Sequence, residues 1–124
     1  MIPNFRAWLK KEKEMIDVDE IHWDRGKFEF IGDGITFQRL ANEVELMQST
    51  GLFDKKGVEI FEGDILADLS ESGDELVYLY VIYKDGKFMA VENEEHGYTA
   101  DLIDCTTYHS VVGNIYENAK LLGR

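Results

Sequence analysis

The residues from Leu76 to Val91 read LVYLYVIYKDGKFMAV, and this stretch decides the fold class. Two runs rich in aliphatic and aromatic side chains flank Asp85-Gly86. Asp-Gly between two such runs is a strong β-hairpin signal, because both positions of a tight type I′ turn need a positive φ angle. The first run, Leu76–Tyr83, is the longest apolar run of the chain. It is far shorter than the ~20 residues of a membrane span, so it predicts a buried strand and no membrane association.

Short strands and turns continue outward from this hairpin in both directions. Asp24-Arg25-Gly26-Lys27 predicts a second hairpin, and Gly32-Asp33-Gly34 predicts a turn followed by a short strand at 35–37. The segment 38–45 is compatible with a helical turn or with irregular structure. Further strands are predicted at residues 5–9, 15–18, 44–48, 58–61, 65–69 and 109–116. This pattern favours a mainly β protein closed as a small barrel, because closure removes strand edges that would otherwise aggregate.

Glu62-Gly63-Asp64 separates the predicted strands at 58–61 and 65–69. In small SH3-like barrels a Gly-Asp pair often starts the strand that turns the corner. Glycine permits the bend, and the aspartate can accept hydrogen bonds from nearby backbone N–H groups. We therefore interpret Asp64 as a turn-capping residue.

The chain is strongly and unevenly acidic. Its 124 residues include 25 Asp+Glu and 13 Lys+Arg, for a formal net charge of −12. Residues 1–62 hold 13 acids and 9 bases (net −4), and residues 63–124 hold 12 acids and 4 bases (net −8). Such a balance opposes binding to a phosphate backbone or to anionic lipid. It is typical of a solvated face, and it is also compatible with a surface for a basic partner.

The single cysteine, Cys105, cannot form an internal disulfide. The first residues, Met1 to Arg6, lack the basic and apolar regions of a signal peptide. We therefore expect a cytoplasmic protein in a reducing compartment.

Several blocks of sequence resemble the YopX-like family of phage and prophage proteins. Leu46–Gly57, which reads LMQSTGLFDKKG, is similar to the family segment LMQ-x-TGL-x-DKNG. Glu59–Ile65 is similar to its EI-Y/F-EGDI run, and the segment from Gly113 to Leu122 to its closing GNIYENPELL. Phe5-Arg6-Ala7-Trp8 resembles its FRAW opening. The blocks lie in family order over nearly the whole chain, with small departures at Leu9, Lys56 and Ala119.

The resemblance implies an SH3-like β-barrel with a smaller N-terminal β (α+β) portion, and a bacteriophage or prophage origin in a bacterial host. We divide the chain into an N-terminal β-rich portion, residues 1–48, and a barrel with a C-terminal tail, residues 49–124, and we expect the two to pack as one compact unit. The resemblance implies no activity, because it carries over no catalytic residue and no cofactor.

We predict a non-enzymatic accessory protein that acts through protein–protein contacts and self-association. Its protein partner is unidentified, and a basic partner is one option. Alternation along Leu76–Tyr83 places Tyr78 and Tyr80 on one face of the strand. If the aliphatic face is the core, both tyrosines project outward, either to pack on the N-terminal portion or on a subunit neighbour, or to line a ligand groove. The predicted interaction surface comprises Tyr78, Tyr80, Glu92, Glu94, Glu95, Asp101 and Asp104.

Two other classes of function remain open from the sequence. A nucleic-acid-binding module would use Arg6, Lys10, Lys11 and Lys13, although Glu12 and Glu14 interrupt them; a nucleic-acid mimic would use the acidic half. A metal-dependent hydrolase would need carboxylates in a shaped pocket. Cys105 and His109 face one another only on a helix, and they precede a predicted strand, so we expect no metal site there. His22 is expected to be packed or at the surface.

Overall fold

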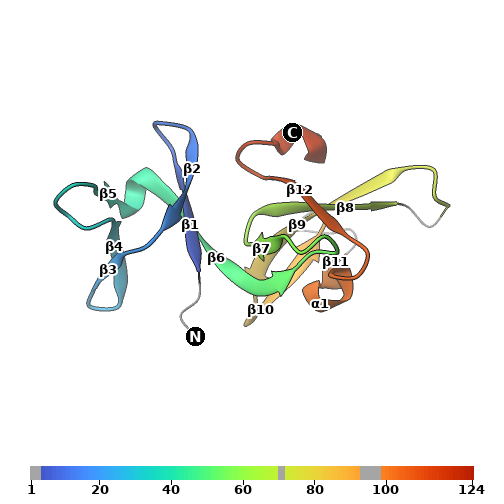
Figure 1. The fold of residues 1–124 in the computed structure, drawn as a ribbon, viewed down its shortest axis with the longest axis horizontal. Helices are drawn as coiled ribbons and strands as arrows, with labels where there is room; N and C mark the ends of the chain where they lie inside the picture. The colour runs from blue at the N-terminus through green and yellow to red at the C-terminus, as the bar shows by residue number, and fades with distance from the viewer. Residues whose placement is uncertain (1–3, 70–71, 93–98) are drawn as a thin grey trace. The chain divides into compact units, whose positions relative to one another are not determined.

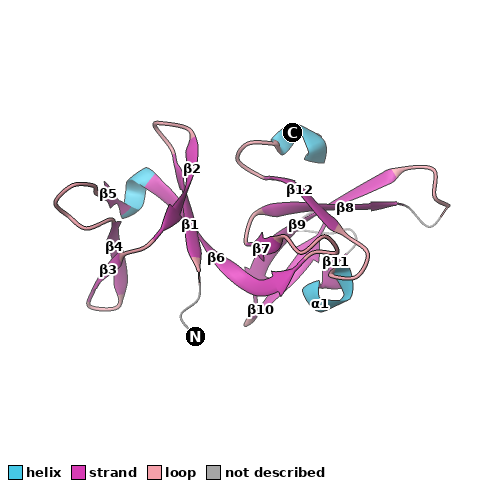
Figure 2. Ribbon diagram, viewed as in Figure 1, coloured by secondary structure: helices cyan, strands magenta, loops and turns pink. Residues whose placement is uncertain are grey.

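The computed structural model describes residues 4–69, 72–92 and 99–124 (Figure 1). Antiparallel strands dominate these residues, so the prediction of a mainly β protein is confirmed (Figure 2). The chain divides into two compact units, Met1–Gln48 (unit 1) and Ser49–Arg124 (unit 2). Strand β6 (Val44–Phe53) crosses the boundary between them.

The strands of unit 1 belong to two small antiparallel sheets. Strand β1 pairs with β2 on one side and with β6 on the other, and β4 lies between β3 and β5. Its elements are β1 (Phe5–Leu9), β2 (Glu14–Val18), β3 (Ile21–Asp24), β4 (Lys27–Ile31), β5 (Arg39–Leu40), the 3-10 helix η1 (Ala41–Glu43) and the start of β6.

Alternating side chains build the core of unit 1. Ala7 and Leu9 of β1 are buried with Ile31 and Val44, as the period of two along a half-buried strand requires. The predicted hairpin at 24–27 is confirmed, with Arg25 and Gly26 at φ 53° and 80°.

The predicted strand at 35–37 is wrong. Ile35 and its neighbours form a loop, because backbone N–H groups that a strand would use for pairing instead donate to the side chain of Asp33. The segment left open at 38–45 contains β5 and η1.

Unit 2 is built on a five-stranded antiparallel sheet with the order β11-β10-β9-β8-β12. The predicted central hairpin is confirmed, with Asp85 and Gly86 at φ 54° and 82° between β9 and β10. The elements after β6 are β7 (Glu59–Phe61), β8 (Asp64–Leu69), β9 (Leu76–Lys84), β10 (Lys87–Val91), β11 (Thr99–Asp101), the short helix α1 (Leu102–Cys105), β12 (Ser110–Asn114) and the 3-10 helix η2 (Ala119–Leu122).

Both faces of the unit 2 sheet are covered. On one face, Leu79 and Val81 pack with Leu66, and α1 adds Leu102 and Cys105. The other face has its own buried cluster. Its buried members are Ile65, Tyr80 and Val91, and Tyr78, Ile82, Met89, Ile115 and Leu122 pack against them.

Two buried aspartates hold the turns of unit 2. Asp64 accepts a hydrogen bond from Phe61 N at 2.8 Å, which confirms its interpretation as a turn-capping residue. Asp54 accepts from Lys56 N and Val58 N through Oδ1, and from Val111 N through Oδ2, each at 2.8 Å. Asp54 therefore fixes its own turn and also ties that turn to β12.

Candidate functional site

A cavity of about 290 Å³ opens in unit 1 where β2 and β4 end. The end of β2 and the segment before β3 form one wall, and the end of β4 and the loop after it form another. Its apolar lining comes from Ile16, Val18, Ile31 and Phe37, and its acidic lining from Asp17, Asp19, Glu20 and Asp33. We call this feature the unit 1 cavity.

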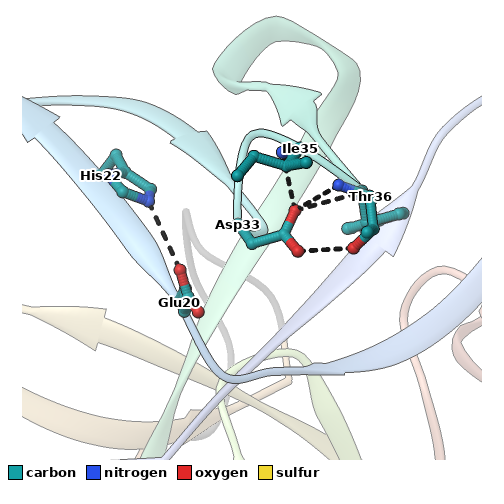
Figure 3. Close-up of polar contacts among 6 residues, drawn as sticks. Glu20, His22, Asp33, Ile35 and Thr36 are labelled. Atoms are coloured by element: carbon teal, nitrogen blue, oxygen red, sulfur yellow. Dashed lines mark hydrogen bonds and ion pairs between the residues drawn. The ribbon is translucent and has the colours of Figure 1, made fainter.

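The loop after β4 is organised by the carboxylate of Asp33 (Figure 3). Its Oδ1 accepts hydrogen bonds from Ile35 N and Thr36 N at 2.8 Å and from Phe37 N at 3.0 Å. Its Oδ2 accepts from the Thr36 hydroxyl. These bonds, the Thr36 hydroxyl foremost and then the Phe37 and Ile35 N–H groups, hold the pKa of Asp33 well below its usual range. Asp33 thus stays ionised beside the cavity while it fixes the loop.

Gly32 makes this tight loop possible. Its φ is +99°, and a Cβ there would lie 2.3 Å from the Phe37 carbonyl oxygen. The loop turns Phe37 towards the core of unit 1 and leaves the Ile35 side chain 91% exposed. A hydrogen-bonded loop therefore presents a large apolar side chain to solvent next to the cavity.

Figure 3 draws Glu20 and His22 beside this loop, and Glu20 lines the cavity together with Asp33. His22 Nε2 is 3.6 Å from Glu20 Oε2, and its ring stacks on Phe30 with centroids 4.2 Å apart. His22 is therefore packed at the surface, as expected from the sequence.

The unit 1 cavity was not predicted. Its only sequence signal is the acidic Asp17–Glu20 segment followed by Gly32-Asp33, which predicts a turn.

The predicted outward projection of both tyrosines is wrong for Tyr80. Tyr80 is 3% exposed, and Tyr78 is half-buried beside it. The physical reason is that the chain after β12 returns over this face: Leu122 packs against the cluster and the Arg124 guanidinium lies 5.1 Å from the Tyr80 ring centroid. The tyrosine face is thus a second core, covered by the C-terminal segment.

A shallow groove of about 430 Å³ lies where the C-terminal segment meets β9. The residues that line it are Leu76, Val77, Tyr78, Glu92, Leu121 and Leu122. We call it the tail groove. It brings together two members of the predicted surface, Tyr78 and Glu92.

The other members of the predicted surface lie elsewhere. Asp101 Oδ1 pairs with Lys87 Nζ at 3.0 Å. Asp104 is exposed on α1 beside Cys105. Glu94 and Glu95 lie outside the described residues.

Acidic side chains lie next to the basic residues near the N-terminus. Lys10 Nζ lies 3.4 Å from Glu45 Oε1 and donates to the Asn42 carbonyl at 3.2 Å. Glu12 accepts two hydrogen bonds from Arg39. The Lys10–Glu45 pair offsets part of the positive charge that a nucleic-acid-binding patch would present.

Cys105 is buried in unit 2, and its thiol is not activated. Burial foremost, together with the nearby Asp104 and Asp68 carboxylates, raises the pKa of Cys105 to about 11. Among residues 4–69, 72–92 and 99–124, no group of three His, Cys, Asp or Glu side chains is arranged to hold a metal ion. Within the same residues, no helix has the length and hydropathy to cross a membrane.

Comparisons with known proteins place this architecture among solved structures. A family model described as "YopX protein" matches residues 4–123. Protein EF1440 from Enterococcus faecalis has a crystal structure similar to this chain, with 33% identity and a TM-score of 0.68 over 98% of this chain and 99% of that one. Protein yopX from Bacillus subtilis shares the fold at 15% identity, with a TM-score of 0.67 over 95% and 96% of the two chains. The comparison with curated proteins finds no match.

Proposed function

The chain belongs to the YopX protein family, and from that premise we propose that it acts by protein–protein contact, without catalysis, and that it self-associates. Membership confirms the resemblance carried by segments such as Leu46–Gly57. The phage or prophage origin, the cytoplasmic location in a bacterial host and the SH3-like character of unit 2 are parts of this proposal. The five short antiparallel strands of the unit 2 sheet support the SH3-like assignment.

The observation that carries the proposal is an aliphatic patch beside the tail groove. Its four members are Leu69 (58% exposed), Leu76 (55%), Val77 (36%) and Leu121 (36%). Leu69 and Leu76 are cross-strand partners, and the other two line the groove with Leu76. Four exposed aliphatic side chains at and beside one groove, on a chain of net charge −12, are more typical of an interaction site than of a solvated face.

A second copy of the chain is the occupant that we propose for this patch. In a twofold dimer the same patch lies on both sides of the interface, so aliphatic surface would meet aliphatic surface. Two copies also bring together two strongly acidic chains. Salt screens that repulsion over about 8 Å at physiological strength, so added salt should strengthen the association.

The test is the molar mass in solution, measured by light scattering over a range of concentrations and at low and high salt. We expect a dimer whose population rises with both. The substitution Leu76→Glu should give a monomer, because it places a charge in the centre of the apolar contact. The matched control is Ile103→Glu, which changes a 61% exposed aliphatic residue on α1 and should leave the dimer intact. A wild-type monomer under all conditions, or equal loss in both variants, would refute the proposal.

A further inference from the structure

The unit 1 cavity belongs to a different part of the chain from the aliphatic patch. All of its lining residues fall between Ile16 and Phe37. Its volume, about 290 Å³, is at the lower end of the ~300–1,000 Å³ that small-molecule sites occupy. The space is therefore suited to one long side chain rather than to a nucleotide or a large cofactor.

The lining of the cavity is divided between two kinds of chemistry. Ile16, Val18, Ile31 and Phe37 provide apolar surface, and they also contact the core of unit 1. Asp17, Asp19, Glu20 and Asp33 provide carboxylates, and no lysine or arginine is among the lining residues, all of which the structure describes. Lysine and arginine side chains match this division, because their aliphatic stems bury against apolar surface while their charged heads stay at a polar rim.

The nearby titratable groups leave negative charge available at the rim. Asp33 is ionised, but its oxygens already accept the loop N–H groups and the Thr36 hydroxyl. Asp17 is the cross-strand partner of the permanently charged Arg6. Glu20 lies 3.6 Å from His22, which is a charged partner only when its imidazole is protonated. Asp19 and Glu20 are therefore the carboxylates on which a cation from outside the chain would most depend.

We propose that the unit 1 cavity is a docking site for a lysine or arginine side chain of a partner protein, with the stem on the apolar floor and the charged head at the Asp19–Glu20 rim. A protein partner is favoured over a free amine by Ile35, which is 91% exposed on the adjacent loop. An apolar residue next to the docked cation would cover Ile35. The site thus fits a basic segment that also carries an aliphatic residue.

The first test uses blocked pentapeptides, acetyl-Ala-Ala-X-Ala-Ala-amide, in which X is lysine, arginine or norleucine. Norleucine keeps the aliphatic stem and lacks the charge. In amide NMR spectra of the ¹⁵N-labelled protein, the lysine or the arginine peptide should shift the resonances of residues 16–20 and 31–37, and comparison of the two identifies the preferred head group. The norleucine peptide should shift them much less. Equal shifts with norleucine, or shifts only outside these residues, would overturn the proposal.

The second test separates the site from the overall negative charge. Asp19→Asn combined with Glu20→Gln should weaken binding of the preferred peptide by roughly threefold to tenfold, since each partly exposed ion pair contributes modestly. The matched control is Asp24→Asn combined with Glu29→Gln, which removes the same charge from exposed positions of unit 1 outside the cavity. Equal weakening by the two double variants would show that only general electrostatic attraction operates, and the site would be refuted.

The response to salt distinguishes this proposal from self-association. Peptide binding should weaken as salt is added, because opposite charges are screened, whereas the dimer should strengthen. Leu76→Glu should bind the lysine or arginine peptide as well as wild type does, even where it is monomeric. Peptide binding that is lost in Leu76→Glu would assign the effect to the dimer and overturn the independent site.

Discussion

Asp33 in unit 1 and Asp54 in unit 2 both accept hydrogen bonds from backbone N–H groups, but in different surroundings. Each carboxylate accepts three backbone N–H hydrogen bonds. The donors to Asp33 lie two to four residues further along the chain, and its side chain is exposed. Asp54 is 6% exposed, and one of its donors, Val111 N, lies 57 residues away.

The difference shows what burial and chain separation add to one hydrogen-bonding pattern. When an exposed acceptor is removed, water can replace it, so the cost is local. When a buried acceptor is removed, its donors keep their desolvation cost without a partner, at about 1–3 kcal/mol each. Asp33 therefore shapes one loop and its presentation of Ile35, whereas Asp54 supports the fold of unit 2.

The largest expected effect comes from Asp54→Ala. The substitution leaves the N–H groups of Val58 and Val111 without their acceptor, and it breaks the tie between the β6–β7 turn and β12. We expect the free energy of unfolding to fall by about 3 kcal/mol or more, as measured by urea denaturation. The control is Asp54→Asn, which keeps one oxygen acceptor and should lose less. A loss below about 1 kcal/mol in Asp54→Ala would contradict a structural role.

The next effect contrasts two glycines of unit 1 that share a positive φ. Gly32 and Gly26 have φ of +99° and +80°, but a Cβ meets the Phe37 carbonyl oxygen at 2.3 Å in the first case and nothing within 4 Å in the second. Gly26→Ala should cost about 1 kcal/mol for the backbone conformation, and Gly32→Ala about 2–3 kcal/mol because steric strain is added. Thermal unfolding of both variants measures the difference. Equal destabilisation would show that the loop moves to accommodate the added Cβ at position 32 without a further cost in the free energy of unfolding.

The sequence was most informative where structure depends on neighbouring residues. Asp85-Gly86 and Arg25-Gly26 carry the local requirement for positive φ, and both hairpins were predicted from it. Asp64 was likewise identified as a turn-capping residue, because its donor, Phe61 N, is three residues away. Nothing in the local sequence of Asp54 indicates its bond to Val111, which lies 57 residues further along the chain.

The candidate sites depended on contacts that local patterns do not contain. Alternation along β9 correctly placed Tyr78 and Tyr80 on one face, but it could not show that Leu122 and Arg124 return to cover that face. The unit 1 cavity was missed for a related reason. Its walls come from two segments about a dozen residues apart, and the end of the second segment, residues 35–37, was predicted to be a strand.

The two aspartates should make the free energy of unfolding depend on pH in the acidic range. For Asp54, burial alone would raise the pKa, but hydrogen bonds from Val111, Val58 and Lys56 outweigh it and hold the pKa below its ordinary value of 3.8. A lowered pKa in the folded state means that the unfolded state binds protons first. The stabilisation is therefore present above about pH 4 and is lost as the pH falls through the folded-state pKa.

We therefore expect the free energy of unfolding of wild type to decrease between about pH 4 and pH 2, and to decrease less steeply in Asp54→Asn. Urea denaturation at each pH measures both slopes. Asp33→Asn should also reduce the slope, because the pKa of Asp33 is lowered as well. Identical slopes in wild type and Asp54→Asn would mean that its hydrogen bonds do not favour the ionised form.

The smallest effect on global stability is expected for Asp33→Ala. This variant tests most directly whether Asp33 acts locally and Asp54 supports the fold. The amides of Ile35, Thr36 and Phe37 lose their acceptor, but solvent can replace it at this exposed position. Urea denaturation should therefore change far less than in Asp54→Ala. Hydrogen exchange at these three amides should accelerate, while the amides of β1 and β4 keep their protection, because local opening and global unfolding are separate events. If exchange accelerated throughout unit 1, the loop would be part of that unit's cooperative core, and the distinction between a local and a structural aspartate would fail.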